Sequence, residues 1–170
     1  MSLDISYYER IVFDRPSTDE YDGYDDGLVC LYPCPDDPEF SSRADGIQDG
    51  WFKPEGETGD FRAGSYGGYN AWRNQLCQMA HGVDSEVFWS DSKYRGTAFY
   101  ELINFADNEG CIGPRTSAKL ASDFMANQAK AEAFAASDAM AIEGDWFLKK
   151  YNEWRKAFEV AAKGGAVQLH

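Results

Sequence analysis

The chain has 170 residues, of which 29 are Asp or Glu and 16 are Lys or Arg, so its formal net charge is −13. A chain of this length usually folds as one domain, and its 44% hydrophobic and 15% aromatic residues are enough for a packed core. The charge argues against a protein that coats nucleic acid or adsorbs to anionic lipid, because both functions need clustered Lys and Arg.

The acidic residues are distributed unevenly along the chain. Residues 1–60 hold 16 acidic and 4 basic residues, a net charge of −12, whereas residues 61–170 hold 13 acidic and 12 basic residues, a net charge of −1. We therefore expect a single domain over residues 1–170 that has two parts. Residues 1–60 would form an acidic strand and loop layer, and residues 61–170 a turn-helix segment, a strand and two long helices.

Targeting signals and metal-binding motifs are the next features to weigh. No apolar run approaches the roughly 18 residues that span a bilayer, and the N-terminal residues do not resemble a signal peptide. We therefore expect a cytoplasmic protein whose cysteines are free thiols, with neither a metal nor a cofactor. The spacing of Cys30 and Cys34 is wider than the usual zinc pair, and Cys77 and Cys111 do not form a second pair.

The first third of the chain shows a strand pattern followed by many turn residues. Apolar residues alternate with polar ones over residues 3–7 and cluster at 11–13, which predicts one or two strands. Asp, Gly and Pro are frequent in residues 16–59, where only 28–32 and 51–52 are strand-like. We predict an irregular, loop-rich layer there.

The middle of the chain is more regular. Residues 61–63 lead into the glycine-rich segment 64–68, and apolar positions at helical spacing then predict a helix over 69–80. Residues 99–105 are apolar enough for a buried strand, although a helical turn is the alternative.

The last third of the chain is dominated by helical patterns. Pro114 suits the first position of a long helix whose apolar face extends to Ala135. A last helix is predicted over 145–163, with an apolar stripe that fits a core or a homo-oligomer interface, and glycines end it. Residues 166–170 alternate as a short strand does. Together these elements predict an α+β fold with a small antiparallel or mixed sheet and about three helices.

The strongest local motif is the glycine-rich turn that feeds the helix at residue 69. A helix N-terminus presents free backbone N–H groups and the positive end of the macrodipole, so it suits an anion. Flanking arginines would clamp a phosphate or carboxylate, and Tyr69 or Trp72 would stack on a base. The alternative is structural: a tight turn, core aromatics, and arginines paired with carboxylates. The candidate ligand-binding residues here are Arg62, Gly64, Ser65, Tyr66, Gly67, Gly68, Tyr69, Asn70 and Arg73.

A second polar group falls between apolar anchors at residues 101–109. Asn104 interrupts an apolar run, and a buried amide is costly unless it is hydrogen-bonded. Asp107 and Glu109 on such a loop can bind magnesium or act as general acid and base, although a solvated turn is the commoner use. We include Asn104, Asp107 and Glu109 in the candidate ligand site.

Nucleophilic catalysis has little support in the sequence. Ser65 does not lie in a G-x-S-x-G motif, and neither histidine has an acid partner that the sequence can place. His81 is expected to cap a helix C-terminus, and His170 to be either frayed or tucked in by the closing strand. We assign no catalytic residue and favour a protein that is not an enzyme.

Several stretches in order along the chain resemble a family of uncharacterised proteins of phage, prophage and bacterial genomes. The resemblance implies a small phage-associated accessory protein that acts in the host cytoplasm, and it implies no activity. The stretches are Leu3–Tyr8, Phe61–Tyr66, Gly68–Asn70, Trp72–Arg73, Phe99–Pro114, Lys119–Ala121, Asp123–Phe124, Trp154–Phe158, Gly165–Val167 and His170.

Three classes of function fit these observations. The first is a protein that binds a small anionic or nucleotide-like ligand without turnover, which in a phage setting would sequester a host immune signal. The second is an acidic interaction protein that mimics nucleic acid or inhibits a basic host protein through residues 1–60. The third is a hydrolase that uses Glu101, Asp107 and Glu109, with magnesium as a possible partner. The first class is favoured.

Overall fold

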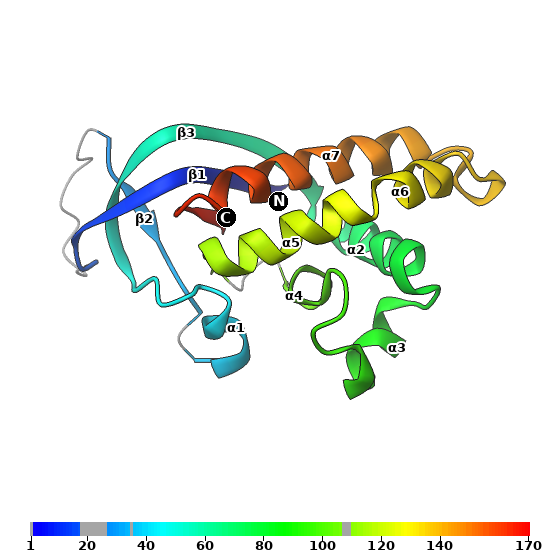
Figure 1. Ribbon diagram of the computed structural model, residues 1–170, viewed down its shortest axis with the longest axis horizontal. Helices are drawn as coiled ribbons and strands as arrows, with labels where there is room; N and C mark the ends of the chain where they lie inside the picture. The colour runs from blue at the N-terminus through cyan, green and yellow to red at the C-terminus, as the bar shows by residue number, and fades with distance from the viewer. Residues whose placement is uncertain (1, 18–26, 35, 107–109) are drawn as a thin grey trace.

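A five-stranded antiparallel sheet organises the fold in the computed structural model, with helices α5 and α7 packed against it and α6 beside α7 (Figure 1). The structure describes residues 2–17, 27–34, 36–106 and 110–170. The strand order is β2-β3-β1-β5-β4. The expected α+β class is therefore confirmed, with an antiparallel sheet. The strands are β1 (Ser2–Arg15), β2 (Val29–Leu31), β3 (Gly50–Ser65), β4 (Cys111–Ile112) and β5 (Ala166–Leu169).

The two faces of the sheet differ because side chains alternate along each strand. Leu3 and Ile5 of β1 are buried against the helices, whereas Ser6 and Tyr8 face the opposite side. Strand β5 pairs with β1, so the last described residue lies beside the start of the chain, as the N and C labels in Figure 1 show. The predicted N-terminal and C-terminal strands are both present, the first as one continuous strand.

Strand β3 corrects the prediction of an irregular layer over residues 16–59. It runs for 16 residues and pairs with β1 along almost its whole length, although the Asp49-Gly50 pair and Pro54 had indicated turns. Beyond residue 52, β3 pairs only with β1 among the described strands, so its outer edge tolerates a proline that lacks an N–H group. Residues 18–26 of the predicted layer lie outside the described residues.

The helices are more numerous than the expected three or so. The described residues contain seven α-helices, and the extra ones are short segments without a clear apolar period. The predicted helix at residues 69–80 begins earlier, and the last one is confirmed to within two residues at each end. The helices are α1 (Pro38–Ser42), α2 (Tyr66–His81), α3 (Ser85–Ser90), α4 (Tyr100–Ile103), α5 (Pro114–Ala126), α6 (Gln128–Ala135) and α7 (Gly144–Ala161).

The long helix predicted from Pro114 to Ala135 is divided at Asn127. The Asn127 amide donates to the carbonyl of Asp123 at 2.9 Å, and its backbone leaves the helical region at ψ 7°. Asparagine side chains compete with helical hydrogen bonds in this way. The result is two helices, α5 and α6, with a bend between them.

The segment predicted as a strand at residues 99–105 contains the single helical turn α4 instead. Phe99 starts the turn with a positive φ of 62°, and its backbone N–H donates to an Asp123 carboxylate oxygen at 2.9 Å. The apolar side chains of this segment point into the core from the turn, which explains why a run of apolar residues suggested a strand. The alternative reading of a helical turn is confirmed.

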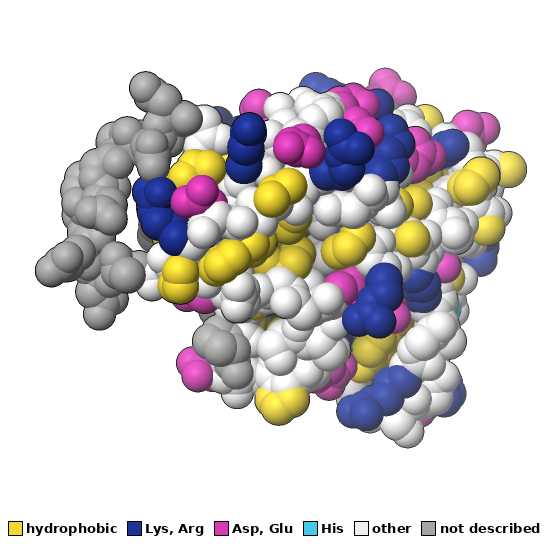
Figure 2. Space-filling view, turned by 60° about the vertical axis from the view of Figure 1, so that its left-hand side comes forward, with side chains coloured by type: hydrophobic (Ala, Val, Ile, Leu, Met, Phe, Trp, Pro, Cys, Tyr) yellow, Lys and Arg dark blue, Asp and Glu magenta, His cyan; other side chains and the backbone are white. Residues whose placement is uncertain are grey.

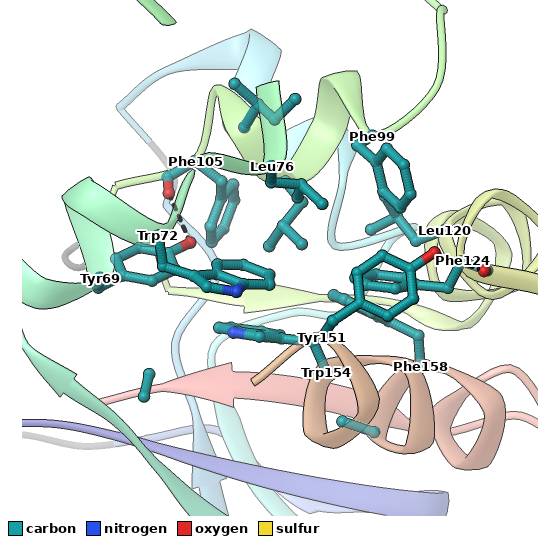
Figure 3. Close-up of a cluster of buried hydrophobic side chains, with 14 of the residues drawn as sticks. Tyr69, Trp72, Leu76, Phe99, Phe105, Leu120, Phe124, Tyr151, Trp154 and Phe158 are labelled. Atoms are coloured by element: carbon teal, nitrogen blue, oxygen red, sulfur yellow. Dashed lines mark hydrogen bonds between the residues drawn. The ribbon is translucent and has the colours of Figure 1, made fainter. Parts of the chain in front are cut away.

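Aromatic rings from α2 and α7 form the centre of the core (Figure 3). The Trp154 ring stacks on Trp72 with centroids 5.8 Å apart and on Phe158 at 5.6 Å. The Tyr151 hydroxyl donates to the carbonyl of Phe124 at 2.6 Å, so its polar end is satisfied within the core. The apolar stripe of α7 is therefore used inside the protein rather than at a dimer interface.

Three buried groups predict that stability falls at high pH. Burial raises the pKa of the Cys77 and Cys111 thiols to about 12 and also raises the pKa of Tyr151. The folded state therefore keeps its protons where the unfolded chain loses them, and the free energy of unfolding should fall as the pH rises from 9 to 12. Urea unfolding at pH 8, 9, 10 and 11 measures the slope. Cys111→Ala should reduce it, and an unchanged slope would contradict this assignment.

Candidate functional site

The predicted glycine-rich turn is the first turn of helix α2. Gly64 has a φ of 127°, which favours glycine, and the chain then enters the helix at Tyr66. The Ser65 hydroxyl accepts a hydrogen bond from the Gly68 N–H at 3.0 Å and caps the helix. The two glycines that follow Ser65 are therefore helical, not part of a loop that cradles a ligand, because the cap starts the helix three residues earlier than expected.

The role of Ser65 as a cap predicts a stability effect. Ser65→Ala should lower the free energy of unfolding by about 1 kcal/mol, because one backbone N–H loses its partner. Ser65→Asp should retain the cap and its stability, since a carboxylate also suits a helix N-terminus. Denaturant unfolding of both variants is the measurement. A loss of the same size in both would exclude the capping role.

Arg62 and Arg73 do not form the predicted clamp. Arg62 lies exposed on β3, opposite Asp4 of β1. Arg73 is buried, with 5% of its surface exposed, and donates to the carbonyls of Ile103 at 3.0 Å and Phe105 at 2.7 Å. The guanidinium of Arg73 thus satisfies the chain that leaves α4, which is the structural alternative that the sequence had left open.

The other residues of the motif surround this contact. Tyr69 is fully buried and its hydroxyl donates to the Phe105 carbonyl at 2.9 Å, while the exposed Asn70 accepts a hydrogen bond from Arg73. Tyr66 is half-buried against the core. Neither Tyr69 nor the buried Trp72 presents a free ring face for a base, so base stacking at this motif is not supported by their positions.

Asn104 faces helix α1 rather than α2. Its side-chain amide donates to the Glu39 carboxylate at 3.2 Å, and its backbone carbonyl accepts a hydrogen bond from the buried Arg43. Asn104 therefore contacts residues near α1, whereas its neighbours Ile103 and Phe105 contact Arg73 of α2, so Asn104 does not form one site with the Gly64–Gly68 segment. Asp107 and Glu109, the remaining members of the predicted site, lie outside the described residues.

Two buried arginines hold the end of α4 from opposite sides. Arg43 donates to the carbonyl of Glu101 at 3.1 Å and to that of Asn104, and Arg73 contacts the carbonyls of Ile103 and Phe105. A positive charge at a helix C-terminus complements the macrodipole and satisfies carbonyls that have no helical partner. The short turn α4 is therefore held by charged donors from two other parts of the chain.

A polar cleft of about 510 Å³ lies between α1, residues 95–101 and the start of α5. Its walls combine two arginines and two glutamates with the Tyr100 ring. Its position beside Asn104 places it next to the second predicted group, although most of its residues were not predicted. The lining residues are Pro38, Glu39, Ser42, Arg43, Arg95, Gly96, Tyr100, Glu101 and Thr116.

The carboxylates of the cleft are already occupied by internal partners. Glu39 accepts from Arg43 at 3.1 Å and from the Tyr100 hydroxyl at 2.8 Å. Burial and this bond to Glu39 raise the pKa of Tyr100, so the hydroxyl remains a proton donor. Glu101 pairs with Lys119 at 2.6 Å. An incoming anion would therefore meet carboxylates whose charge is largely compensated.

Arg95 is the exposed cation of the cleft. Its side chain is 69% exposed and lies 3.9 Å from Glu39, a distance too long for a good hydrogen bond. Arg115, next to the lining residue Thr116, is also exposed and lies 3.4 Å from Asp45. Guanidinium groups bind phosphate and carboxylate through two parallel N–H groups, which a loosely held arginine can offer.

Sequence reasoning missed Glu39, Arg43, Arg95 and Tyr100. Glu39 and Arg43 belong to a segment predicted as irregular. They form an ion pair four residues apart between helix α1 and the residue that caps its C-terminus. Asp37 accepts from the Glu39 N–H at 2.8 Å and caps that helix, so an Asp-Pro-Glu pattern was the available local signal. No local pattern marks the other two.

The acidic residues of the first sixty positions are partly neutralised within the chain. Glu57 pairs with Lys156 of α7 at 2.8 Å, and Glu9 accepts from the Glu57 N–H at the same distance. On the face shown in Figure 2, basic and acidic side chains lie interspersed. Among the described residues, this arrangement gives less support to a continuous acidic docking surface than the net charge had indicated. Five of the sixteen acidic residues lie at positions 18–26, outside the described residues.

Metal and histidine chemistry near the predicted site is limited. Within the described ranges, no three His, Cys, Asp or Glu side chains are placed to hold a metal ion. His81 does not cap its own helix: its ring contacts Phe88 and Tyr94 and hydrogen-bonds to the Ala98 carbonyl at 2.8 Å. The left-handed Gly82 ends α2 instead.

Comparison with known proteins does not add to this picture. No protein-family model, curated protein or solved structure matches the chain. None of the helices in the described residues has the length and apolar character needed to cross a membrane.

Proposed function

We propose that the protein binds a small anionic or nucleotide-like ligand in the cleft beside α4 and does not transform it. The carrying observation is Arg95, an exposed guanidinium at a polar cleft whose carboxylates already have internal partners. The Tyr100 ring forms part of the same wall, so the cleft offers an aromatic surface beside the cation. This combination suits a phosphate or carboxylate attached to a ring.

The buried contacts at the end of α4 support a wall of the cleft that is formed before a ligand binds. Arg43 is buried and its guanidinium lies 4.8 Å from the Phe40 ring centre while it holds the carbonyls at the end of α4. Preformed walls reduce the entropy lost on binding. The resemblance to phage proteins leads us to propose further that the bound molecule is a nucleotide signal of the host, which the protein would sequester.

The test is a thermal-shift screen with nucleoside monophosphates, diphosphates, triphosphates and cyclic dinucleotides. The proposal expects at least one of them to raise the melting temperature of the wild type, and Arg95→Ala to abolish the rise. Mass spectrometry of the ligand after incubation should show it unchanged. The absence of any shift would remove the proposal, and conversion of the ligand would replace binding by catalysis.

Arg10→Ala is the matched control. Arg10 is also exposed, 57% against 69% for Arg95, and it also lies 3.9 Å from a glutamate, Glu55. It lies on β1 and does not line the cleft. Loss of one charge and one weak ion pair is thus common to both variants. If the ligand still raises the melting temperature of Arg10→Ala but not that of Arg95→Ala, the ligand binds in the cleft.

A further inference from the structure

A second pocket, of about 290 Å³, lies on the sheet face that points away from the core helices. It contains a serine, a histidine and a thiol together with two tyrosine hydroxyls, groups that the ligand cleft lacks in this combination. It shares no lining residue with that cleft. Its lining residues are Ser6, Tyr8, Val29, Cys30, Tyr32, Gln168 and His170.

The pocket places a serine hydroxyl within hydrogen-bond distance of a histidine ring. The Ser6 hydroxyl oxygen and His170 Nε2 are 2.9 Å apart. Strand pairing holds them there, because the Asp4 N–H donates to the His170 carbonyl at 2.9 Å and the His170 N–H donates to the Asp4 carbonyl at 3.0 Å. A serine within hydrogen-bond reach of an imidazole is the signature of an activated nucleophile.

A carboxylate occupies the position beside the histidine. Asp4 and His170 form a directly opposite cross-strand pair, so their Cβ atoms lie about 4.5–5.5 Å apart on the same face. Ser6 is two residues further along β1 and therefore on that face too. Ser6 and His170 thus share one face of the sheet, and Asp4 lies on that face across the strand pair from His170.

We propose that this patch is a second functional site, in which Ser6 attacks the acyl carbon of a small carboxylic ester with His170 as the base. The inference goes beyond ligand binding in the cleft and does not depend on it. The rings of Tyr8 and Tyr32, with Val29, give the pocket an apolar wall for a short acyl or aromatic group.

The reaction balances with water as the only co-reactant. The Ser6 oxygen forms a bond to the acyl carbon as its proton moves to His170 Nε2, and the ester C–O bond breaks as that proton passes to the leaving alkoxide. Water then attacks the acyl-serine and gives a proton to His170. The bond between the acyl carbon and the Ser6 oxygen breaks as His170 returns that proton to the Ser6 oxygen, which releases the carboxylic acid and the free serine.

Tyr8 supplies a donor for the developing oxyanion. It lies next to Ser6 on the same face, and burial raises the pKa of its hydroxyl so that it stays protonated. Tyrosine hydroxyls serve as oxyanion donors when they are held in place before the reaction.

The experiment uses the full chain and a fluorophosphonate probe, with intact-mass and peptide mapping, and p-nitrophenyl acetate hydrolysis in parallel. The wild type should carry one adduct, on Ser6, and Ser6→Ala none. His170→Gln should label at least tenfold more slowly, whereas His81→Gln, the matched change at the other histidine, should label at the wild-type rate. Arg95→Ala should also label normally, which separates this site from the cleft.

No adduct, an adduct on another residue, or an unchanged rate in His170→Gln would overturn the proposal. Because His170 is exposed, that variant remains informative if Ser6→Ala fails to fold.

Discussion

Replacement of Arg73 by methionine is expected to lower the free energy of unfolding by about 3 kcal/mol, because buried carbonyls lose charged donors. Arg73 donates to Ile103 and Phe105 at the end of α4. Trp89 and Tyr69 also donate to these two carbonyls, so part of the hydrogen bonding is kept and the protein should still fold. Urea unfolding monitored by tryptophan fluorescence measures the loss.

Arg62→Met is the matched control for this prediction. Both arginines flank the same glycine-rich segment and both were expected to bind a ligand, but Arg62 is exposed on β3. Exposed substitutions of this kind usually change stability by less than about 0.5 kcal/mol. Equal losses in the two variants would show that Arg73 does not have the structural role assigned to it.

Trp154→Ala is expected to have the largest effect on stability, a loss of about 3–5 kcal/mol. Trp154 is fully buried and contacts Trp72, Phe158 and Phe61, the last in an edge-on contact at 5.2 Å. Its removal leaves a cavity between α2, α7 and the sheet that these large rings cannot fill. Thermal and urea unfolding measure the loss together.

Ile142→Ala is the control for removal of apolar surface as such. Ile142 is 96% exposed, so its truncation removes few packing contacts and should change the free energy of unfolding by less than about 0.5 kcal/mol. A loss below about 1 kcal/mol for Trp154→Ala would contradict its place at the centre of the core.

Elements with a strong period were predictable from the sequence. The apolar stripe of α7, from Phe147 to Phe158, is buried as a 3.6-residue period requires, and the alternation of residues 166–169 forms β5. Their ends were also marked, because Gly164 and Gly165 interrupt the helix. In these segments local pattern and tertiary packing favour the same structure.

Elements that depend on distant partners were not predictable. Strand β3 contains Pro54 and four glycines, and only the long pairing with β1 makes it a strand. Helix α4 is a single turn whose carbonyls accept hydrogen bonds from two distant arginines. Arg43 is 58 residues from Glu101, and Arg73 is 30 residues from Ile103. Short segments of this kind take the structure that their tertiary contacts stabilise.

The same limit applies to the sites. The sequence drew attention to Asn104, which does lie beside the cleft, but it assigned the cations to Arg62 and Arg73 because these residues flank a glycine-rich helix start. The exposed cation of the cleft, Arg95, lies in a stretch without a motif, and the contact of Ser6 with His170 spans 164 positions. Strand pairing and helix packing create both arrangements.

The central claim is that a ligand binds at Arg95 and not at Arg73. Isothermal titration of the nucleotide that stabilises the protein most, into the wild type, Arg95→Ala and Arg10→Ala, tests it most directly. The account predicts at least a tenfold weaker affinity for Arg95→Ala, about 1.4 kcal/mol, and an unchanged affinity for Arg10→Ala. Equal affinities in all three proteins would contradict it.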